Sequence, residues 1–216
     1  MHRYFVTGTD TDVGKTRVTA ALALALKEAG LAPTIVKVVQ TGLAPGIPGD
    51  AARAAKLSGA RGLELARYEK AADPWSAALA QGSPEPYAGE LVDAIAHLEH
   101  GVVAEGAGGL MVPLNAREHM GHIVARGKFD TVLVIGLKLG CINHALLTID
   151  QLNSAGLPLA GAVLVERWEP TEAHYRDDVV RTLEGKAHIF GVLPYDLDEA
   201  ASVRAGAQLF TTFLRG

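Results

Sequence analysis

Short apolar runs alternate along the chain with longer stretches that mix apolar and polar residues. The runs are rich in Val, Ile and Leu at consecutive positions, which is typical of parallel strands buried on both faces. Six strands are expected at Tyr4–Thr7, Thr34–Val39, Val102–Glu105, Thr131–Ile135, Ala160–Val165 and Ile189–Val192. Helices are expected at Lys15–Ala29, Ala51–Leu57, Ala88–Leu98, His119–Lys128, Asn143–Ala155, Thr171–Leu183 and Ser202–Phe213.

The turn after the first expected strand predicts a phosphate-binding loop. It reads Gly-Thr-Asp-Thr-Asp-Val-Gly-Lys-Thr over Gly8–Thr16 and leads into an alanine-rich helix. Backbone N–H groups of such a turn cradle phosphates, while Lys15 would reach the β/γ-phosphates and the Thr16 hydroxyl would bind Mg²⁺. Five residues separate Gly8 from Gly14, one more than in the usual pattern, so the flanking strand and helix support the assignment. An incidental glycine turn is the less favoured alternative.

The order of elements predicts an α/β fold, namely a doubly wound, mainly parallel sheet with helices on both faces, like that of P-loop NTPases. The chain of 216 residues shows no repeat or linker and fits a single domain over 1–216. Two irregular segments, Leu43–Gly49 and Tyr68–Tyr87, are expected to be loops near the site. Ligands should bind at the carboxyl ends of the strands.

Composition narrows the possible partners and location. The net charge is −4, and no basic run or interleaving of aromatic and basic residues indicates nucleic-acid binding. A single cysteine, Cys141, argues against a disulfide framework or a multi-cysteine zinc site. Without a signal-peptide pattern or an apolar run of membrane-spanning length, we expect a cytoplasmic protein with no membrane partner.

Lys37 lies in the otherwise apolar second expected strand. A buried lysine is costly unless its charge is used, and at this strand end it could stabilise a transferring phosphoryl group or a developing carboxylate. The alternative is a lysine that extends from an edge strand to solvent. Thr41 follows and could either bind substrate or form a turn.

Two acids stand close to later strand ends. Glu105 ends the third expected strand and would bind Mg²⁺ directly or through water, while the glycines of Gly106–Gly109 let the backbone approach a ligand. Asp50 could help to hold Mg²⁺ or could cap the following helix, and the two interpretations are evenly balanced.

The segment Gly140–Asn143 opens a helix whose free N–H groups would suit a carboxylate. Cys141 lies near His144, but without a third orienting group a nucleophilic pair is rejected in favour of a small buried side chain. His119 and His122 lack partners at metal-ligand spacing and are expected to be structural or solvated.

These segments together resemble dethiobiotin synthetases, the ATP-dependent carboxylases of biotin synthesis. The resemblance rests on Tyr4–Thr16, Lys37, Glu105–Gly109 and Lys138–Ala145. It implies a P-loop ATPase-like fold and a homodimer with the diamine at the subunit interface. It also implies the conversion of CO₂, 7,8-diaminononanoate and ATP to dethiobiotin, ADP and phosphate through a carbamate and a carbamic-phosphoric anhydride.

The resemblance also implies roles for individual residues. Lys15 and Lys37, with Thr11, would carry catalysis by neutralising the carbamate and γ-phosphate. Thr16, Asp50 and Glu105 would hold Mg²⁺. The nucleotide would contact Asp12, Val13, Gly14, Lys15, Thr16, Asp50, Glu105, Gly106, Ala107 and Gly108. Thr41 would contact the diamine or carbamate, and Gly140, Cys141, Ile142 and Asn143 would bind the carboxylate of the substrate from the neighbouring subunit, with Tyr175 a looser match.

The chain departs from the family pattern on the base side. Many relatives end the fifth strand with an adenine-reading Asn-Asp, whereas this chain has Val-Glu-Arg-Trp at Val165–Trp168. Base selectivity is therefore expected to be relaxed or rebuilt, with Glu166 able to accept from an exocyclic amine. Leu193, Pro194 and Tyr195 would border the base. Asp73–Ala78 matches the substrate-side loop only loosely, so the wall around the diamine is expected to differ.

Two other functions share this scaffold. A partitioning or septum-positioning ATPase switch carries an extra lysine early in its loop, which Gly8–Thr11 lacks, and Ser202–Gly216 has only two arginines for a membrane-binding face. The amide-forming domain of cobyric acid synthesis needs a fused glutaminase, for which the chain is too short. We therefore favour the synthetase.

Overall fold

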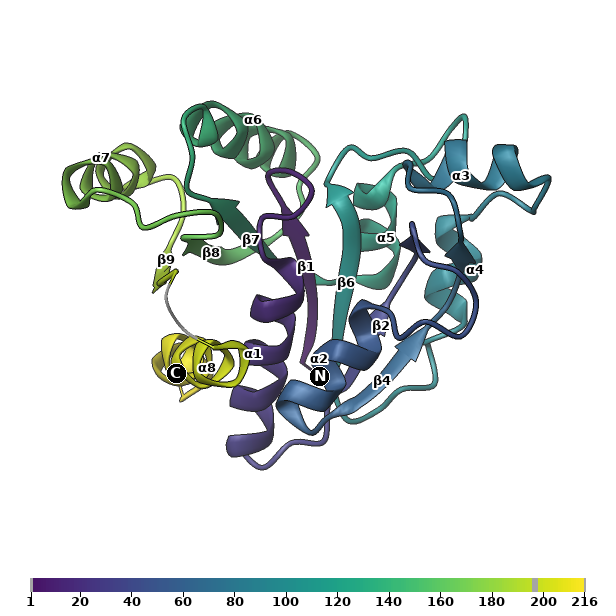
Figure 1. Cartoon of the computed structure of the whole chain (residues 1–216), viewed down its shortest axis with the longest axis horizontal. Coiled ribbons are helices and arrows are strands. Elements are labelled where there is room, and N and C mark those ends of the chain that lie inside the picture. Colours follow the sequence, from purple (N-terminus) through teal and green to yellow (C-terminus); the bar gives the residue numbers. More distant parts are fainter. Residues whose placement is uncertain (1, 196–197, 216) are drawn as a thin grey trace.

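The computed structural model describes residues 2–195 and 198–215, and its centre is a seven-stranded sheet in the order β4-β2-β6-β1-β7-β8-β9 (Figure 1). Each pairing in this sheet is parallel, as predicted. The strands are β1 (Arg3–Gly8), β2 (Thr34–Lys37), β4 (Arg61–Glu64), β6 (Val102–Gly109), β7 (Asp130–Gly136), β8 (Leu159–Val165) and β9 (Ile189–Leu193). The short strands β3 (Gln40–Thr41) and β5 (Arg67–Tyr68) pair separately, also in parallel.

Helices cover both faces of the sheet (Figure 1). The helices α1, α2 and α8 pack on one face, while α3, α4 and α5, and beyond them α6 and α7, pack on the other. Their bounds are α1 (Lys15–Glu28), α2 (Asp50–Ser58), α3 (Pro74–Gln81), α4 (Ala88–Asp93), α5 (Met120–Gly127), α6 (Cys141–Ser154), α7 (Ala173–Leu183) and α8 (Glu199–Arg215). Within the described ranges, no helix is long and apolar enough to cross a membrane.

The sequence of β1 explains why it lies at the centre. Side chains alternate between the faces of a strand, so Tyr4 and Val6 join the core under α1 and α8, whereas Phe5 joins the opposite core under α5. All three side chains are almost fully buried. The consecutive apolar residues Tyr4, Phe5 and Val6 therefore suit a central strand, which brings the turn after Gly8 to the middle of the carboxyl edge.

The structure corrects several of the sequence-based boundaries. Glu105 does not end its strand, because β6 continues to Gly109, whereas β2 ends at Lys37 and not at Val39. The segment Tyr68–Tyr87 is not a loop, because it contains the end of β5 and all of α3, which Asp73 caps by accepting from the Ser76 N–H at 2.9 Å. The strand β4 was missed because its sequence Arg-Gly-Leu-Glu carries one large apolar residue, which suffices at a sheet edge. The helix expected to run to Leu98 ends at Asp93 and continues as turns. The predicted loop Leu43–Gly49 is confirmed.

Candidate active site

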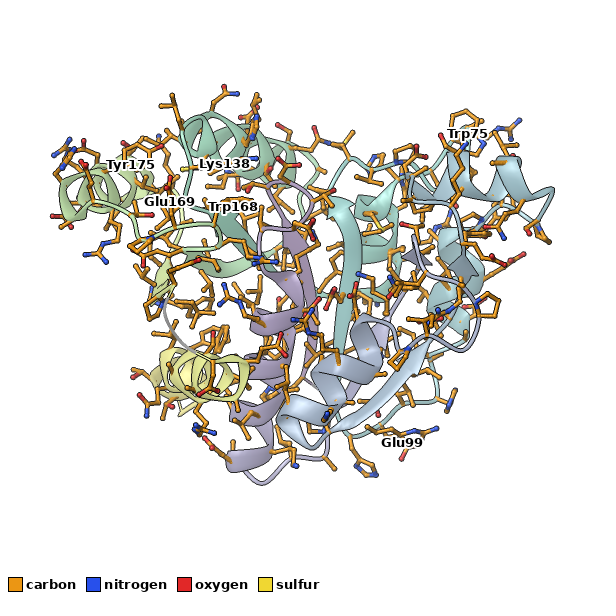
Figure 2. The ribbon with its side chains drawn as sticks, viewed as in Figure 1. Trp75, Glu99, Lys138, Trp168, Glu169 and Tyr175 are labelled. Carbon is orange, nitrogen blue, oxygen red and sulfur yellow. The ribbon has the colours of Figure 1, made fainter. Side chains whose placement is uncertain are left out.

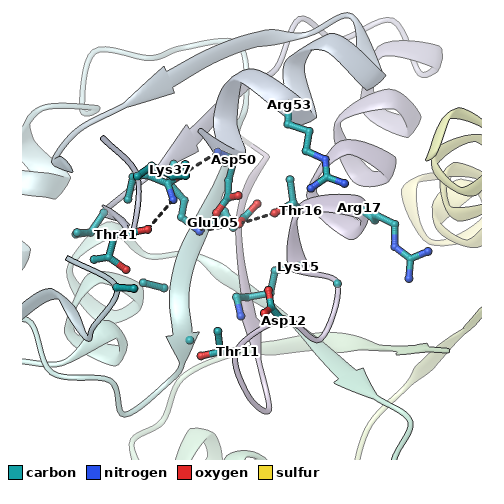
Figure 3. Close-up of a pocket in the computed structure, with 18 of the residues that line it drawn as sticks. Thr11, Asp12, Lys15, Thr16, Arg17, Lys37, Thr41, Asp50, Arg53 and Glu105 are labelled. Atoms are coloured by element: carbon teal, nitrogen blue, oxygen red, sulfur yellow. Dashed lines mark hydrogen bonds and ion pairs between the residues drawn. The ribbon is translucent and has the colours of Figure 1, made fainter. Parts of the chain in front are cut away.

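A cavity of about 1000 Å³ opens at the carboxyl edge of the sheet (Figure 3). It brings together the phosphate loop, the segments that follow β2 and β3, the end of β6, and loops after β8 and β9. Of the residues predicted for function, it is lined by Thr11, Asp12, Gly14, Lys15, Thr16, Lys37, Thr41, Asp50, Glu105, Ala107, Gly108 and Tyr195. The position is the one that a doubly wound sheet provides for a ligand.

The phosphate loop has the conformation that its spacing requires. Gly14 has a φ of 101°, which is left-handed and favours glycine, and no side chain caps the helix α1 that begins after it. Asp12 is also left-handed, with a φ of 56°. A Cβ atom at Gly8 would lie 2.7 Å from Val13 Cγ2, so the longer loop folds closely over its first glycine. The uncapped N–H groups of the first turn of α1 are available to an anion.

Lys15 folds back across this loop and donates from Nζ to the Asp10 carbonyl at 2.9 Å. Its side chain is buried, and no carboxylate forms an ion pair with it within the described ranges. Burial, together with the nearby charge of Lys37, lowers the pKa of Lys15 to about 8. The cation is thus held in a poorly solvated place that an anionic ligand would stabilise.

Lys37 is the last residue of β2, which lies between β4 and β6, so the edge-strand alternative is wrong. Its Nζ is 2.6 Å from Asp50 Oδ2 and 2.8 Å from Glu105 Oε1, and it donates to the Gly106 carbonyl at 3.1 Å. Burial alone would lower the pKa of Lys37, but the charges of Glu105 and Asp50 outweigh it and hold the pKa above its ordinary value. The ammonium is therefore charged.

Asp50 faces Lys37 and does not cap its helix. The N-cap of α2 is Gly49, and the backbone N–H of Asp50 donates to Gln40 Oε1 at 2.9 Å. Burial alone would raise the pKa of Asp50, but Lys37 overcomes it and keeps the pKa below its ordinary value. The helix-capping interpretation of Asp50 is therefore wrong, and its binding of Mg²⁺ stays a prediction.

Three oxygen-bearing side chains suit a hard divalent cation beside the phosphate loop. The Thr16 hydroxyl donates to Glu105 Oε1 at 3.0 Å, and Asp50 lies across Lys37 from Glu105. Glu105 Oε2 is buried and has no hydrogen-bond partner within the part of the chain that the structure describes. An unpaired buried carboxylate oxygen is costly, and a cation would satisfy it. No trio of His, Cys, Asp or Glu in the described ranges could hold a metal ion by itself.

The base side of the cavity differs from the prediction. Glu166 is only 4% exposed and does not line the cavity. One carboxylate oxygen accepts from Arg176 Nη1 at 3.1 Å, and the other accepts from the Tyr195 N–H at 3.2 Å. Both oxygens are therefore used within the protein. Leu193 and Pro194 also lie outside the lining.

Three arginines that the sequence analysis did not select line this side, namely Arg17, Arg53 and Arg167. The Arg17 guanidinium donates to Ser202 Oγ at 3.3 Å, and its Nη2 is buried without a partner among the described residues. Arg17 stands two positions after Lys15 on the first turn of α1. Its place next to the motif is the signal that could have identified it, whereas Arg167 is brought there only by the fold.

The start of α6 is separate from the cavity. None of Gly140, Cys141, Ile142 and Asn143 lines it. Cys141 is buried, and its Sγ lies 3.5 Å from the Tyr175 hydroxyl, so it is structural. The neighbouring Leu139 is 93% exposed. His119 caps α5 by accepting from the Gly121 N–H at 3.1 Å, and His122 accepts from the His119 N–H, which confirms structural roles for both.

Solved structures with the same fold include two ATPases. The chain aligns over its full length with 93% of a ParA family ATPase from Chlorobium tepidum, at a TM-score of 0.59 and 14% identity. It also aligns over 99% of its length with all of the cell division ATPase MinD from Pyrococcus furiosus, at a TM-score of 0.58 and 18% identity. These identities establish the fold alone, which is the predicted one.

Similarity in sequence identifies the family, which the fold alone does not. The family model described as an AAA domain matches residues 2–201. The chain is 42% identical to the ATP-dependent dethiobiotin synthetase of Rhodococcus jostii, a match that covers 96% of this chain and 93% of the relative. It is 37% identical to that of Nitrosospira multiformis, over 92% of this chain and 90% of the relative. With this identity over nearly its whole length, the chain belongs to the family of ATP-dependent dethiobiotin synthetases.

Proposed function

We propose that this protein uses ATP to close the ureido ring of dethiobiotin from 7,8-diaminononanoate and CO₂. The observation that supports it best is the placement of two buried lysines, Lys15 and Lys37, in one cavity at the phosphate loop. A reaction that passes through a carbamate and a carbamic-phosphoric anhydride builds negative charge at each step. Fixed cations in a poorly solvated site are what stabilise such charge.

The chemistry needs no protein nucleophile. One amine adds CO₂ to form a carbamate, which takes the γ-phosphoryl group of ATP and releases ADP. The second amine then attacks the carbonyl, and phosphate leaves as the ring closes. The protein contributes orientation and charge: Thr11 and Thr41 offer hydroxyls to the substrate, and Lys15 binds the γ-phosphate by exchanging the Asp10 carbonyl for phosphate oxygens.

Lys37 would bind the carbamate by exchanging one of its carboxylate partners for it. Of its two carboxylate partners, Glu105 is 1% exposed and Asp50 is 31% exposed, so Asp50 is the partner nearer to the open cavity. We propose that Lys37 keeps Glu105 and turns from Asp50 to the substrate anion.

Thr16, Asp50 and Glu105 would hold Mg²⁺, consistent with the unpaired Oε2 of Glu105. When bound, the ion would neutralise part of the charge on the phosphate oxygens. The nucleotide would run from Gly14–Thr16 toward Arg167 and Tyr195, with Asp12, Ala107 and Gly108 beside it. Val13 and Gly106 do not line the cavity and lie behind the residues that do.

The carboxylate of the substrate would bind at the start of α6 of a second copy, in a homodimer. Gly140–Asn143 lie outside the cavity of their own chain, and Leu139 beside them is exposed. The first turn of α6 has no side-chain cap, and although the Cys141 N–H donates to the Lys138 carbonyl, the N–H groups of Ile142 and Asn143 suit a carboxylate. In this arrangement, one subunit would hold the reacting amines and its partner the far end of the molecule.

The test is turnover by the purified protein with Mg·ATP, bicarbonate and 7,8-diaminononanoate. We expect dethiobiotin to form and ADP release to depend on the diamine. If the protein binds ATP but the diamine does not stimulate ADP release, the proposal is wrong. The same assay with CTP and GTP measures base selectivity, for which Glu166 is poorly placed because it is buried outside the cavity and both its carboxylate oxygens already accept hydrogen bonds from the protein.

A further inference from the structure

Two later loops meet the outer side of the phosphate loop, away from Lys15 and Lys37. They are the loop between β7 and α6 and the loop after β8. Lys138, between β7 and α6, places its Nζ 2.7 Å from Asp10 Oδ2. The same ammonium lies 5.0 Å from the centre of the Trp168 ring, which comes from the loop after β8. Figure 2 shows Lys138 and Trp168 close together below α6. Lys138 therefore connects the phosphate loop with two later loops.

Asp10 presents an electrostatic problem that Lys138 solves. An acidic side chain in a loop that receives a triphosphate would repel it across a short distance. The Asp10 carboxylate is held by two donors, the Thr11 N–H at 2.7 Å and the Lys138 ammonium at 2.7 Å. The backbone carbonyl of the same residue accepts from Lys15 Nζ. The residue that Lys138 neutralises is thus also the one that Lys15 contacts.

The Lys138 backbone is itself well fixed. Its carbonyl accepts from the Tyr175 hydroxyl at 3.0 Å and from the Cys141 N–H at 3.0 Å. The Trp168 ring lies against the end of β7, where a Cβ atom at Gly136 would come within 2.9 Å of the ring. The ammonium therefore projects from an ordered backbone and is flanked by an aromatic ring and a carboxylate, which restricts its position.

We propose that Lys138 is a positioning residue for nucleotide binding, which acts by neutralising and fixing Asp10 so that the phosphate loop does not present this negative charge to the triphosphate. The inference rests on the proposed nucleotide site but not on the diamine reaction. The partners are 40% and 41% exposed, and ion pairs of this kind contribute little to folding stability. The effect of Lys138 should therefore appear in nucleotide affinity and not in the melting temperature.

The decisive variants are Lys138→Met and the double variant Asp10→Asn with Lys138→Met, with Lys186→Met as an exposed lysine control. Calorimetric titration with Mg·ATP at low salt should show the Kd raised about 3- to 10-fold in Lys138→Met, as expected for one unneutralised charge near a polyanion. The double variant should return to within about 2-fold of the parent, because the repelling charge is gone. The difference should shrink at high salt.

A spectroscopic readout checks the contact without nucleotide. The chain has two tryptophans, so Trp75→Phe leaves Trp168 as the only one. In this background, Lys138→Met should shift the emission of Trp168, whereas Lys186→Met should not. An unchanged emission would overturn the placement of the ammonium over the ring.

The two proposals fail in different ways. If the parent protein binds no Mg·ATP at all, the nucleotide site and this inference both fall. If the parent binds normally and Lys138→Met binds equally well, only the role of Lys138 is overturned. A double variant that stays as weak as Lys138→Met would also overturn it, because the loss would then not arise from the charge of Asp10.

Discussion

At one end of the cavity, Lys15 and Thr16 lie in the first turn of α1, Lys37 ends β2 and Glu105 lies within β6. At the other end, Arg167 and Tyr195 come from the loops after β8 and β9. In the proposed nucleotide site these are the phosphate end and the base end. Positions of the first kind are fixed by the sheet and vary little with the loop sequence. The geometry of the phosphate end can therefore be kept while the loops of the base end change.

The two buried lysines at the phosphate end are themselves unlike. Lys37 is surrounded by two carboxylates and has a raised pKa, whereas Lys15 contacts a backbone carbonyl and has a pKa lowered to about 8. One cation is compensated inside the protein, and the other is left for the ligand to compensate. We infer that Lys15 supplies binding of phosphate and that Lys37, once released by Asp50, supplies charge to the reacting carbamate.

The largest effect is expected for Lys37→Ala. Loss of the cation should lower kcat by roughly 10²-fold or more, because charge that develops in the transition state would lose a fixed partner. It should also lower the melting temperature, since Glu105 would be left buried and unpaired. Steady-state kinetics below the melting temperature of the variant separate the two effects.

The matched control is Lys27→Ala. Lys27 lies at the other end of α1 and donates to the Ser58 and Gly59 carbonyls, at 3.2 Å and 2.7 Å, so its loss affects helix contacts and not the cavity. Its kcat should equal that of the parent. Unchanged turnover in Lys37→Ala as well would assign Lys37 to folding alone.

The second effect is a pH dependence set by Lys15. Since nucleotide binding needs the ammonium and its pKa is about 8 in the free protein, the Kd for Mg·ATP should rise by up to about tenfold for each pH unit above 8. Binding near pH 8 should take up protons, which calorimetry in buffers of different ionisation enthalpy detects. Lys15→Arg keeps its charge and should show a flat profile.

The sign of the linkage for folding follows from the same shift. The folded pKa of Lys15 lies below the unfolded value of 10.5, so between about pH 8 and 10.5 the unfolded chain binds more protons. The contribution of Lys15 to folding stability therefore rises with pH through that window, whereas nucleotide affinity falls. A Kd that stays constant from pH 7 to 10 in the parent would contradict the lowered pKa.

The contrast between the two ends also explains what the sequence could predict. Residues Lys15, Thr16, Lys37 and Glu105 were recognisable because each is unusual for a buried strand or a helix start, and parallel strands bring such ends together. The fold was predictable because its central strands carry consecutive apolar residues that fill the cores on both faces of the sheet. β4 was not, because one large apolar residue suffices at the edge of the sheet.

The partners that each loop side chain contacts could not be predicted from the local sequence. Glu166 follows β8 as expected, but the backbone of Tyr195 and the guanidinium of Arg176, both distant in sequence, occupy its carboxylate. The arginines Arg17, Arg53 and Arg167 gather only because α1, α2 and the loop after β8 converge on one cavity. Such sets depend on tertiary contacts that no motif records.

The smallest effect, on nucleotide affinity, is expected at the base end, where we compare the single variants Tyr195→Ala and Glu166→Gln. Tyr195 lines the cavity and is 41% exposed, whereas Glu166 is buried behind it and holds the Tyr195 N–H. Tyr195→Ala should raise the Kd for Mg·ATP by about 3- to 10-fold through the loss of contact area with the nucleotide.

Glu166→Gln should change the Kd for Mg·ATP by less than about 3-fold and leave the ratio of the Kd values for ATP, CTP and GTP unaltered. The same substitution should lower the free energy of unfolding by about 1–2 kcal/mol, because it weakens the bond to Arg176. Titrations with the three nucleotides and thermal melts of both variants measure these quantities. A change of base preference in Glu166→Gln alone would show that this carboxylate reads the base, and the base end would then be built like the phosphate end, from a strand-end side chain that contacts its ligand directly.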